Sequence, residues 1–112
     1  MVKPVVVFND FARLDLRVGT VRVVEDIEGS DKLYRLTVDL GIEYGTKTII
    51  AGVKPWYKSE DIHGKQFIFA ANLEPRKMMG EVSNGMLLAA EADGKAVLLP
   101  LSGGVPNGAT LR

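Results

Sequence analysis

The sequence predicts an all-β domain, a small Greek-key barrel with short helices and an extension at each end. Three observations favour it. Apolar segments of strand length recur along the 112 residues, and turn-forming residues separate them. The segment Tyr34 to Leu40 alternates apolar and polar side chains with a period of two. A short stretch with helical character separates the third strand from the fourth.

Composition indicates one globular domain over residues 1–112, with residues 1–10 and 100–112 as flanking extensions. Hydrophobic residues make up 46% and charged residues 25% of the chain. There is no cysteine and only one histidine, His63, so a zinc site built from those ligands is excluded. No apolar run approaches the roughly 20 residues of a membrane span. We therefore expect a cytoplasmic protein without metal or cofactor.

The chain opens with the apolar run Val5 to Phe8. Exposed, such a run invites aggregation, so we expect it either to pair into the sheet or to pack on a second copy of the chain. Asn9 or Asp10 is expected to cap a short helix over residues 11–14 through its side chain.

Three strands are expected next: Leu16 to Ile27, then Tyr34 to Leu40 after a turn at residues 28–31, then Thr46 to Ala51. In the first of these the apolar phase shifts by one residue near Gly19. A glycine at a phase change is typical of a β-bulge or sharp bend, so we expect one there.

A short helical or irregular connection is expected over residues 54–62, followed by a fourth strand from Gln66 to Ala71. Further strands are expected at 86–91 and 95–101, joined in a tight hairpin through Asp93-Gly94. The element order is that of an OB-fold: three strands, a short helix, a fourth strand, a long loop and a fifth strand. That fold binds ligands through the loops between strands one and two and between strands four and five.

The polar segment from Asn72 to the strand at Met86 is expected to be a loop that crosses open space. It holds Arg76 and Lys77, the only adjacent pair of cationic side chains in the chain. Arginine binds a phosphate through two parallel hydrogen bonds and lysine adds a point charge. The candidate RNA-binding residues are Lys32, Asn72, Arg76, Lys77, Ser83 and Met86.

For Asn72 and Ser83 the alternative is that their side chains bond the backbone at the strand ends, and we favour it. For Arg76 and Lys77 the alternative is that they only keep a long loop soluble, and there we favour binding. Met78 and Met79 either offer a soft surface to an unstacked base or fill gaps, and we expect at least one to be core.

The aromatic pair Trp56 and Tyr57 lies between Lys54 and Lys58, a pattern suited to stacking on RNA bases. A short helix that closes a barrel end also needs apolar mass, and we favour packing. The total charge is zero, but residues 47–77 carry six basic and three acidic side chains. This excess either marks a phosphate-binding face or is a chance fluctuation.

No enzymatic site is indicated. Glu60 and Asp61 are adjacent and so point to different faces of an element, which does not suit a general acid and base pair. Ser102-Gly103-Gly104 lacks the Lys and Ser or Thr of a phosphate-binding P-loop and is typical of an ordinary turn.

Several blocks resemble the small tRNA-binding domain found beside, or fused to, aminoacyl-tRNA synthetases. The resemblance runs from Phe11 to Arg112 and departs at residues 28–30, where many members carry His-Pro. The matching blocks are Asp15-Leu16-Arg17-Val18-Gly19, Asp31-Lys32-Leu33-Tyr34, Ala51-Gly52-Val53 with Tyr57, P-R-K-M at 75–78 and S-x-G-M-L-L-A at 83–89. Asp15 and Arg17, two apart on one strand face, are interpreted as a structural pair.

The resemblance implies an OB-fold that grips tRNA by its shape, without catalysis. It implies a free-standing domain or a separate β subunit that assists methionyl-tRNA synthetase, and a homodimer joined through residues 5–8 and 99–111. The alternative function is that of an export-related chaperone of the same fold, which binds extended peptides. The intact block at 83–89 favours tRNA.

Overall fold

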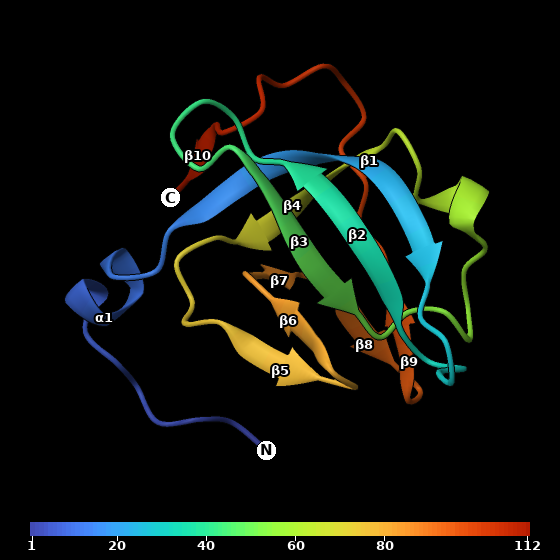
Figure 1. The fold of residues 1–112 in the computed structure, drawn as a ribbon. Helices are drawn as coiled ribbons and strands as arrows, with labels where there is room; N and C mark the ends of the chain where they lie inside the picture. Colours follow the sequence, from blue (N-terminus) through green and yellow to red (C-terminus); the bar gives the residue numbers. More distant parts are fainter.

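The protein is described by a computed structural model that covers residues 1–112 (Figure 1). It consists almost entirely of short antiparallel strands, with one α-helix near the N-terminus and one 3-10 helix. In chain order these are α1 (Phe8–Ala12), β1 (Leu16–Asp26), β2 (Tyr34–Asp39), β3 (Thr46–Ala51), η1 (Ser59–Asp61), β4 (Gln66–Ala70), β5 (Arg76–Met78), β6 (Glu81–Ser83), β7 (Met86–Leu87), β8 (Ala90–Ala92), β9 (Lys95–Val97) and β10 (Thr110–Leu111).

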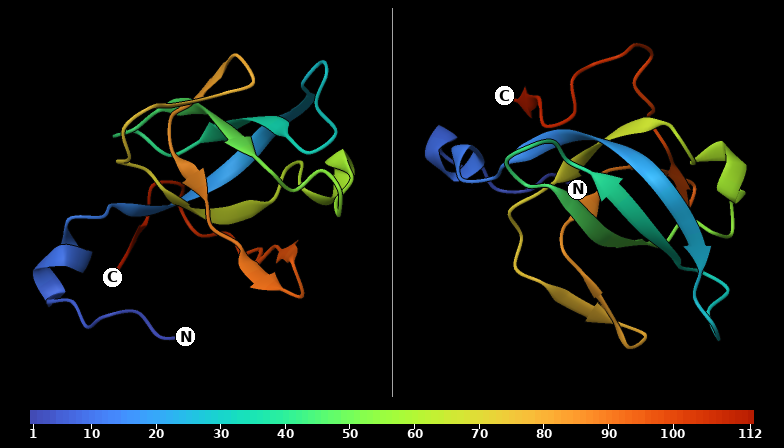
Figure 2. Two further views of the ribbon diagram at one scale, coloured as in Figure 1. Left: turned by 90° about the horizontal axis from the view of Figure 1, so that it is seen from below. Right: turned by 45° about the horizontal axis from the view of Figure 1, so that its top comes forward.

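One curved sheet forms the body, with strand order β3-β2-β1-β4-β7 and with β10 paired to β1. All of its pairs are antiparallel. The sheet curls until β3 lies against β6 and β7 (Figures 1 and 2). The backbone N–H of Asn84 also donates to the carbonyl of Thr48 at 2.8 Å. The sheet is therefore a nearly closed barrel, which confirms the expected OB-fold.

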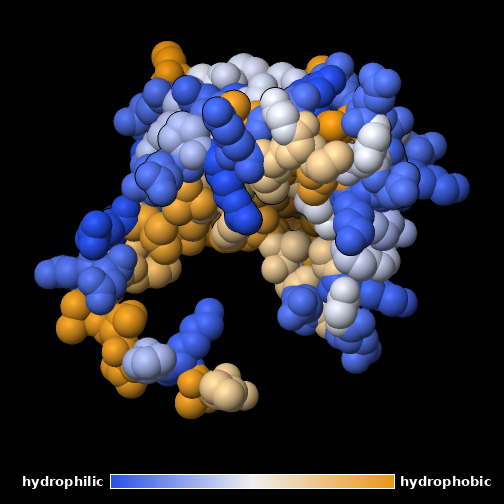
Figure 3. All heavy atoms as spheres, turned by 60° about the horizontal axis from the view of Figure 1, so that its bottom comes forward, coloured by the Kyte–Doolittle hydropathy of each residue, from blue (hydrophilic) through white to orange (hydrophobic).

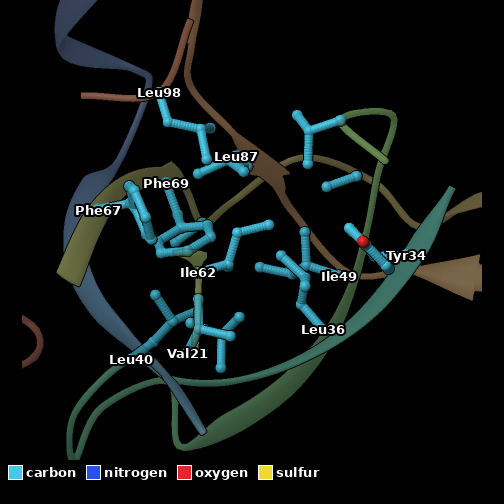
Figure 4. Close-up of a cluster of buried hydrophobic side chains, with 14 residues drawn as sticks. Val21, Tyr34, Leu36, Leu40, Ile49, Ile62, Phe67, Phe69, Leu87 and Leu98 are labelled. Atoms are coloured by element: carbon cyan, nitrogen blue, oxygen red, sulfur yellow. The ribbon is translucent and has the colours of Figure 1, made fainter. Parts of the chain in front are cut away.

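The interior of the barrel is a single cluster of apolar side chains (Figure 4). Phe67 and Phe69 project inward from β4 and are fully buried, as their shared strand face predicts. Leu36 from β2, Ile49 from β3 and Leu87 from β7 meet them, while η1 ends on the buried Ile62. The strands expected at the positions of β1 to β4 are confirmed to within one residue.

The prediction of a bulge at Gly19 is wrong, because the bulge lies elsewhere in β1 and Gly19 is needed for a different reason. The pairing of β1 with β2 shifts register between Val21 and Val23, three residues further along. Gly19 is required for space instead, because a Cβ there would lie 2.8 Å from side-chain carbons of both Leu40 and Val38. The strand therefore packs tightly against the core at Gly19, and its irregular pairing comes later, between Val21 and Val23.

The N-terminal segment also differs from expectation. Helix α1 begins at Phe8, and its N-cap is Val7, with no side-chain cap from Asn9 or Asp10. Residues 1–7 form no strand, so the apolar run does not pair into the sheet. It extends from the body as an arm, and Val5 is 99% exposed (Figure 1).

The segment expected to be a loop between β4 and β7 folds instead into the β-hairpin β5–β6. Its turn has positive φ at both central residues, 51° at Met79 and 78° at Gly80. Methionine is rarely found in that conformation, so the sequence did not indicate a two-residue hairpin there.

The expected hairpin at Asp93-Gly94 is confirmed between β8 and β9, with φ of 53° and 75°. The strand expected over 86–91 is two short strands, because after Leu88 donates to the Ile68 carbonyl the chain leaves the body to form this separate ribbon. The last extension returns to the body, where β10 pairs with the start of β1.

Candidate nucleic-acid interface

The hairpin β5–β6 is fixed to the barrel by hydrogen bonds and one ion pair. The buried Ser83 hydroxyl accepts from the Ile50 backbone N–H at 2.9 Å and donates to the Gly85 carbonyl at 2.9 Å. Glu81 forms an ion pair with Arg35 of β2 at 3.0 Å. Because these contacts lie on β6, strand β5 is the outer strand of the hairpin and faces solvent (Figure 1).

The pairing register determines where the two cationic side chains of β5 point. Lys77 pairs with Val82, and both are exposed. Arg76 pairs with the buried Ser83 but lies at the open end of the hairpin and is itself exposed. There it lines a pocket of about 70 Å³ together with Met86, which is 45% exposed. The structure thus places Arg76 beside Met86 at the open end of the hairpin and Lys77 on the opposite face of β5, with both cationic side chains exposed.

The hairpin tip faces the loop between β1 and β2. Residues 29–33 and Met79 line a shared pocket of about 370 Å³, and Lys32 is exposed on its wall. The Ser30 hydroxyl shapes this loop by accepting from the backbone N–H groups of Lys32 and Leu33. The structure therefore places Lys32 across this pocket from the tip of the hairpin that carries Arg76 and Lys77.

Two of the candidate residues have their polar groups occupied inside the protein. Ser83 is 2% exposed, and both of its hydrogen bonds go to backbone groups. Asn72 accepts from the backbone N–H of Asp15 at 2.8 Å and donates to the Arg13 carbonyl at 2.7 Å. These side chains bond the backbone at strand ends, which is the alternative that the sequence favoured for both.

A polar network holds β1, the β2–β3 loop and the C-terminal segment together. Arg17 donates to both carboxylate oxygens of Asp15, at 2.6 and 3.0 Å, and also to Glu43 and to the Gly108 carbonyl. Tyr44 donates to Asp15 at 2.6 Å and lies beneath the guanidinium of Arg17. The hydrogen bond from Arg17 lowers the pKa of Asp15, and the bond to Asp15 raises the pKa of Tyr44.

Sequence reasoning anticipated the pairing of Asp15 with Arg17 but not the contributions of Glu43 and Tyr44. No short-range signal points to them, because they come from a loop that reaches β1 only once the barrel is formed.

The aromatic pair has two different environments. Tyr57 is structural: its hydroxyl accepts from the Leu98 N–H at 3.0 Å, and its carbonyl accepts from the Tyr34 hydroxyl at 2.7 Å. Trp56 is 40% exposed. Of the two methionines, Met78 is half-buried and Met79 is 59% exposed.

No three histidine, aspartate or glutamate side chains gather closely enough to hold a metal ion. None of the helices has the length and apolar character needed to cross a bilayer.

An OB barrel with an exposed cationic hairpin between its fourth and fifth barrel strands, β4 and β7, belongs to the class of OB-fold binding domains. Residues 16–110 match the family model described as "Putative tRNA binding domain". The chain belongs to this family of tRNA-binding domains, and the resemblance seen in its sequence is confirmed.

Similar curated proteins are methionine–tRNA ligases. That of Methanothrix thermoacetophila is 51% identical over 110 residues, which cover 98% of this chain and 16% of the ligase. That of Pyrococcus horikoshii is 52% identical over 92 residues, 82% of this chain and 12% of the ligase. The chain thus spans less than a fifth of the length of these two relatives.

Two solved structures share the fold over almost their whole length. A MetRS-related protein from Pyrococcus horikoshii has a TM-score of 0.91 at 37% identity, covering 98% of this chain and all of that one. The chaperone CsaA from Bacillus anthracis has a TM-score of 0.87 at 33% identity, covering 97% of this chain and all of that one.

Proposed function

We propose that this chain is a non-catalytic module that binds folded tRNA through Arg76, Lys77 and Lys32. The observation that carries the proposal is the fixed hairpin, which presents Arg76 and Lys77 to solvent in a member of the tRNA-binding family. Phosphate contacts of this kind position a nucleic acid without reading its sequence. Met86 and the Met79 tip add apolar area beside them, whereas Asn72 and Ser83 act by holding the surrounding backbone.

We further propose that the module acts in the cytoplasm with a methionyl-tRNA synthetase, as a separate subunit that raises tRNA affinity. Support comes from the similarity to segments of methionine–tRNA ligases. It also comes from the MetRS-related protein, whose entire chain aligns with this one. Linking a weak RNA contact to a second binding site increases affinity without new chemistry.

We also propose that two copies associate through the N-terminal arm. The arm presents Val5 to Phe8 to solvent, and α1 and β10 form a groove of about 460 Å³ lined by Phe8, Phe11 and Leu111. Figure 3 shows an open hollow between the arm and the apolar surface of the body. A second arm fills such a hollow by burying apolar surface on both sides.

The second candidate function is peptide binding as a chaperone. The likeness to CsaA supports it, and so does the half-apolar lining of the same groove. An extended apolar peptide would compete for this groove with the arm of a second copy, whereas tRNA would contact the hairpin on another side of the barrel.

The experiment that tests the proposed RNA contact compares the double variant R76A/K77A with the native chain. Removal of two phosphate contacts is expected to weaken tRNA binding. It should also flatten the slope of log K against log salt by about two units. The measurement is a filter-binding titration at several salt concentrations.

The matched control is K3A/K95A, which removes the same charge from two exposed lysines that form no ion pair. Its salt slope should equal that of the native chain. Equal slopes for R76A/K77A and the native chain would show that the hairpin does not contact phosphates.

A further inference from the structure

The largest pocket of the molecule lies away from the hairpin. It has a volume of about 570 Å³ and lies between β1, the start of β4 and the segment at 100–104. Figures 1 and 2 show the 100–106 segment and the hairpin on opposite sides of the barrel. Arg22 and Lys65 are its only charged lining residues, and no acidic side chain lines it.

Arg22 occupies the β-bulge of β1, where the register with β2 shifts. Bulges redirect side chains and are enriched beside binding sites. Its Nη2 donates to Asp39 at 3.1 Å, which orients the guanidinium and leaves Nε and Nη1 without a partner in the chain. The side chain is 55% exposed, so these donors are accessible from the pocket.

Lys65 is held beside Arg22 by two backbone hydrogen bonds. The Val21 N–H donates to the Lys65 carbonyl at 3.0 Å, and the Gly64 N–H donates to the Val21 carbonyl at 2.8 Å. The two cationic side chains therefore rise from adjacent, fixed backbone. Lys65 forms no ion pair.

The opposite wall is the segment that contains Ser102, Gly103 and Gly104, and it too is fixed at both ends. The Leu101 N–H donates to the Gln66 carbonyl at 2.9 Å, and the Val105 N–H donates to Gln66 Oε1 at 3.2 Å. Between these anchors the backbone N–H groups of Gly103 and Gly104 donate to no acceptor in the chain.

Neither glycine is explained by the fold. A Cβ at Gly103 or Gly104 would meet nothing within 4 Å, and neither residue has a positive φ. Glycine is required where a turn is strained, where packing is tight, or where a ligand approaches the backbone closely. The first two reasons are absent. The third agrees with free backbone N–H groups in a segment that lines the same pocket as Arg22 and Lys65.

We propose that this pocket binds a phosphate group, held by Arg22, Lys65 and the backbone N–H groups of Gly103 and Gly104. Successive free N–H groups beside cationic side chains are a recurrent phosphate-binding arrangement. The inference deepens the proposed function, on which it rests, by assigning a second contact to the RNA backbone on the side opposite the hairpin.

The first test follows the amide resonances of Gly103 and Gly104 by NMR during titration with inorganic phosphate, against sodium chloride at equal ionic strength. Phosphate is expected to shift both resonances in a saturable manner in the native chain. The variant G103V/G104V should remain folded, because both added side chains point into open space. The backbone amides at positions 103 and 104 should then lose the response, because the branched side chains block the approach of phosphate to the N–H groups. No saturable shift in the native chain, or an unchanged response in the variant, would overturn the proposal.

The second test asks whether the phosphate belongs to RNA. In R22A/K65A the salt slope of tRNA binding should fall by about two units, as in R76A/K77A, while K3A/K95A should keep the native slope. A native slope in R22A/K65A, with a reduced slope in R76A/K77A, would overturn the second RNA contact and leave the proposed function intact. A native chain that binds phosphate at Gly103 and Gly104 but binds no tRNA would overturn the proposed function instead.

Discussion

Asp15 contacts two distant parts of the chain. Its carboxylate accepts hydrogen bonds from Arg17 and from Tyr44, and its backbone N–H donates to the side-chain Oδ1 of Asn72. Only the Arg17 pairing is visible in the sequence, as a two-residue spacing. Tyr44 is 29 residues away, and its hydrogen bond exists only because the barrel brings the β2–β3 loop back onto β1.

Acid is expected to weaken the fold through Asp15. Its pKa in the folded chain lies below the ordinary value, mainly because Arg17 bonds its carboxylate. The stabilisation is therefore complete above the ordinary pKa of an aspartate and is lost as the pH falls through the lowered value. The free energy of unfolding, measured by urea titration from pH 6 down to pH 2.5, should show this loss.

The variant D15N is the comparison for this prediction. It should be less stable than the native chain at pH 6 by about 1 to 3 kcal/mol, because Arg17 and Tyr44 lose a charged acceptor. The difference between the two chains should shrink as the pH falls. A constant difference down to pH 2.5 would mean that the carboxylate charge contributes nothing.

For Ser83 and Asn72, residue type alone indicates that the side chain bonds the protein backbone. Both were candidates for RNA contact, and backbone bonding was favoured for both because these residue types commonly cap strand ends. Their placement agrees with that alternative. Arg76 and Lys77, by contrast, have no role within the fold that the sequence or the structure supplies.

At the scale of elements, strands with clear alternation were predictable and the connections between them were not. The pattern of β2 alone fixes its buried face, with Tyr34, Leu36 and Val38 all inside. The sequence does not indicate the hairpin β5–β6, because its two-residue turn begins with Met79. Asp93-Gly94 has the residue types that two-residue hairpin turns prefer, so the sequence predicts the hairpin between β8 and β9.

Gly19→Ala is expected to destabilise β1. The added methyl would lie 2.8 Å from Leu40 and Val38 and 3.1 Å from Phe69, so the core must shift. Overpacking of this kind costs about 1 to 3 kcal/mol, which thermal unfolding detects readily.

Gly52→Ala is the matched control for that substitution. There the nearest atom is a Leu33 methyl at 3.7 Å, an ordinary contact, and φ is not positive. Its melting temperature should equal or slightly exceed that of the native chain. Equal melting temperatures for both variants would mean that Gly19 is not needed for close packing.

At the scale of the whole molecule, the basic excess over residues 47–77 does not form one face. Arg76 and Lys77 lie on the hairpin, while Lys65 lines the pocket on the other side of the barrel. Summed charge along the sequence therefore leaves open whether there is a phosphate-binding face, and it does not indicate how the charges divide. Which face each charge occupies depends on where the chain leaves β4 to form the hairpin, and no residue pattern in the sequence marks that point.

If the exposed arm joins two copies of the chain, substitutions in the arm should prevent dimer formation. Replacing Val6 and Phe8 together by aspartate should convert the proposed dimer to a monomer, because each change buries a charge in an apolar contact. Sedimentation equilibrium over a range of concentrations measures it. The control is Ile42→Asp, which alters a fully exposed apolar side chain on the β2–β3 loop. A monomeric native chain, or a variant that remains dimeric, would contradict the proposal.

The measurement that bears most directly on the central claim is a titration of the native chain against folded tRNA, unfolded tRNA and an extended apolar peptide, at two salt concentrations. Binding should prefer folded tRNA and weaken as salt rises, because the contacts recognise the shape of the tRNA and its phosphates. Peptide binding without preference for folded tRNA would contradict the claim and would favour the chaperone function instead.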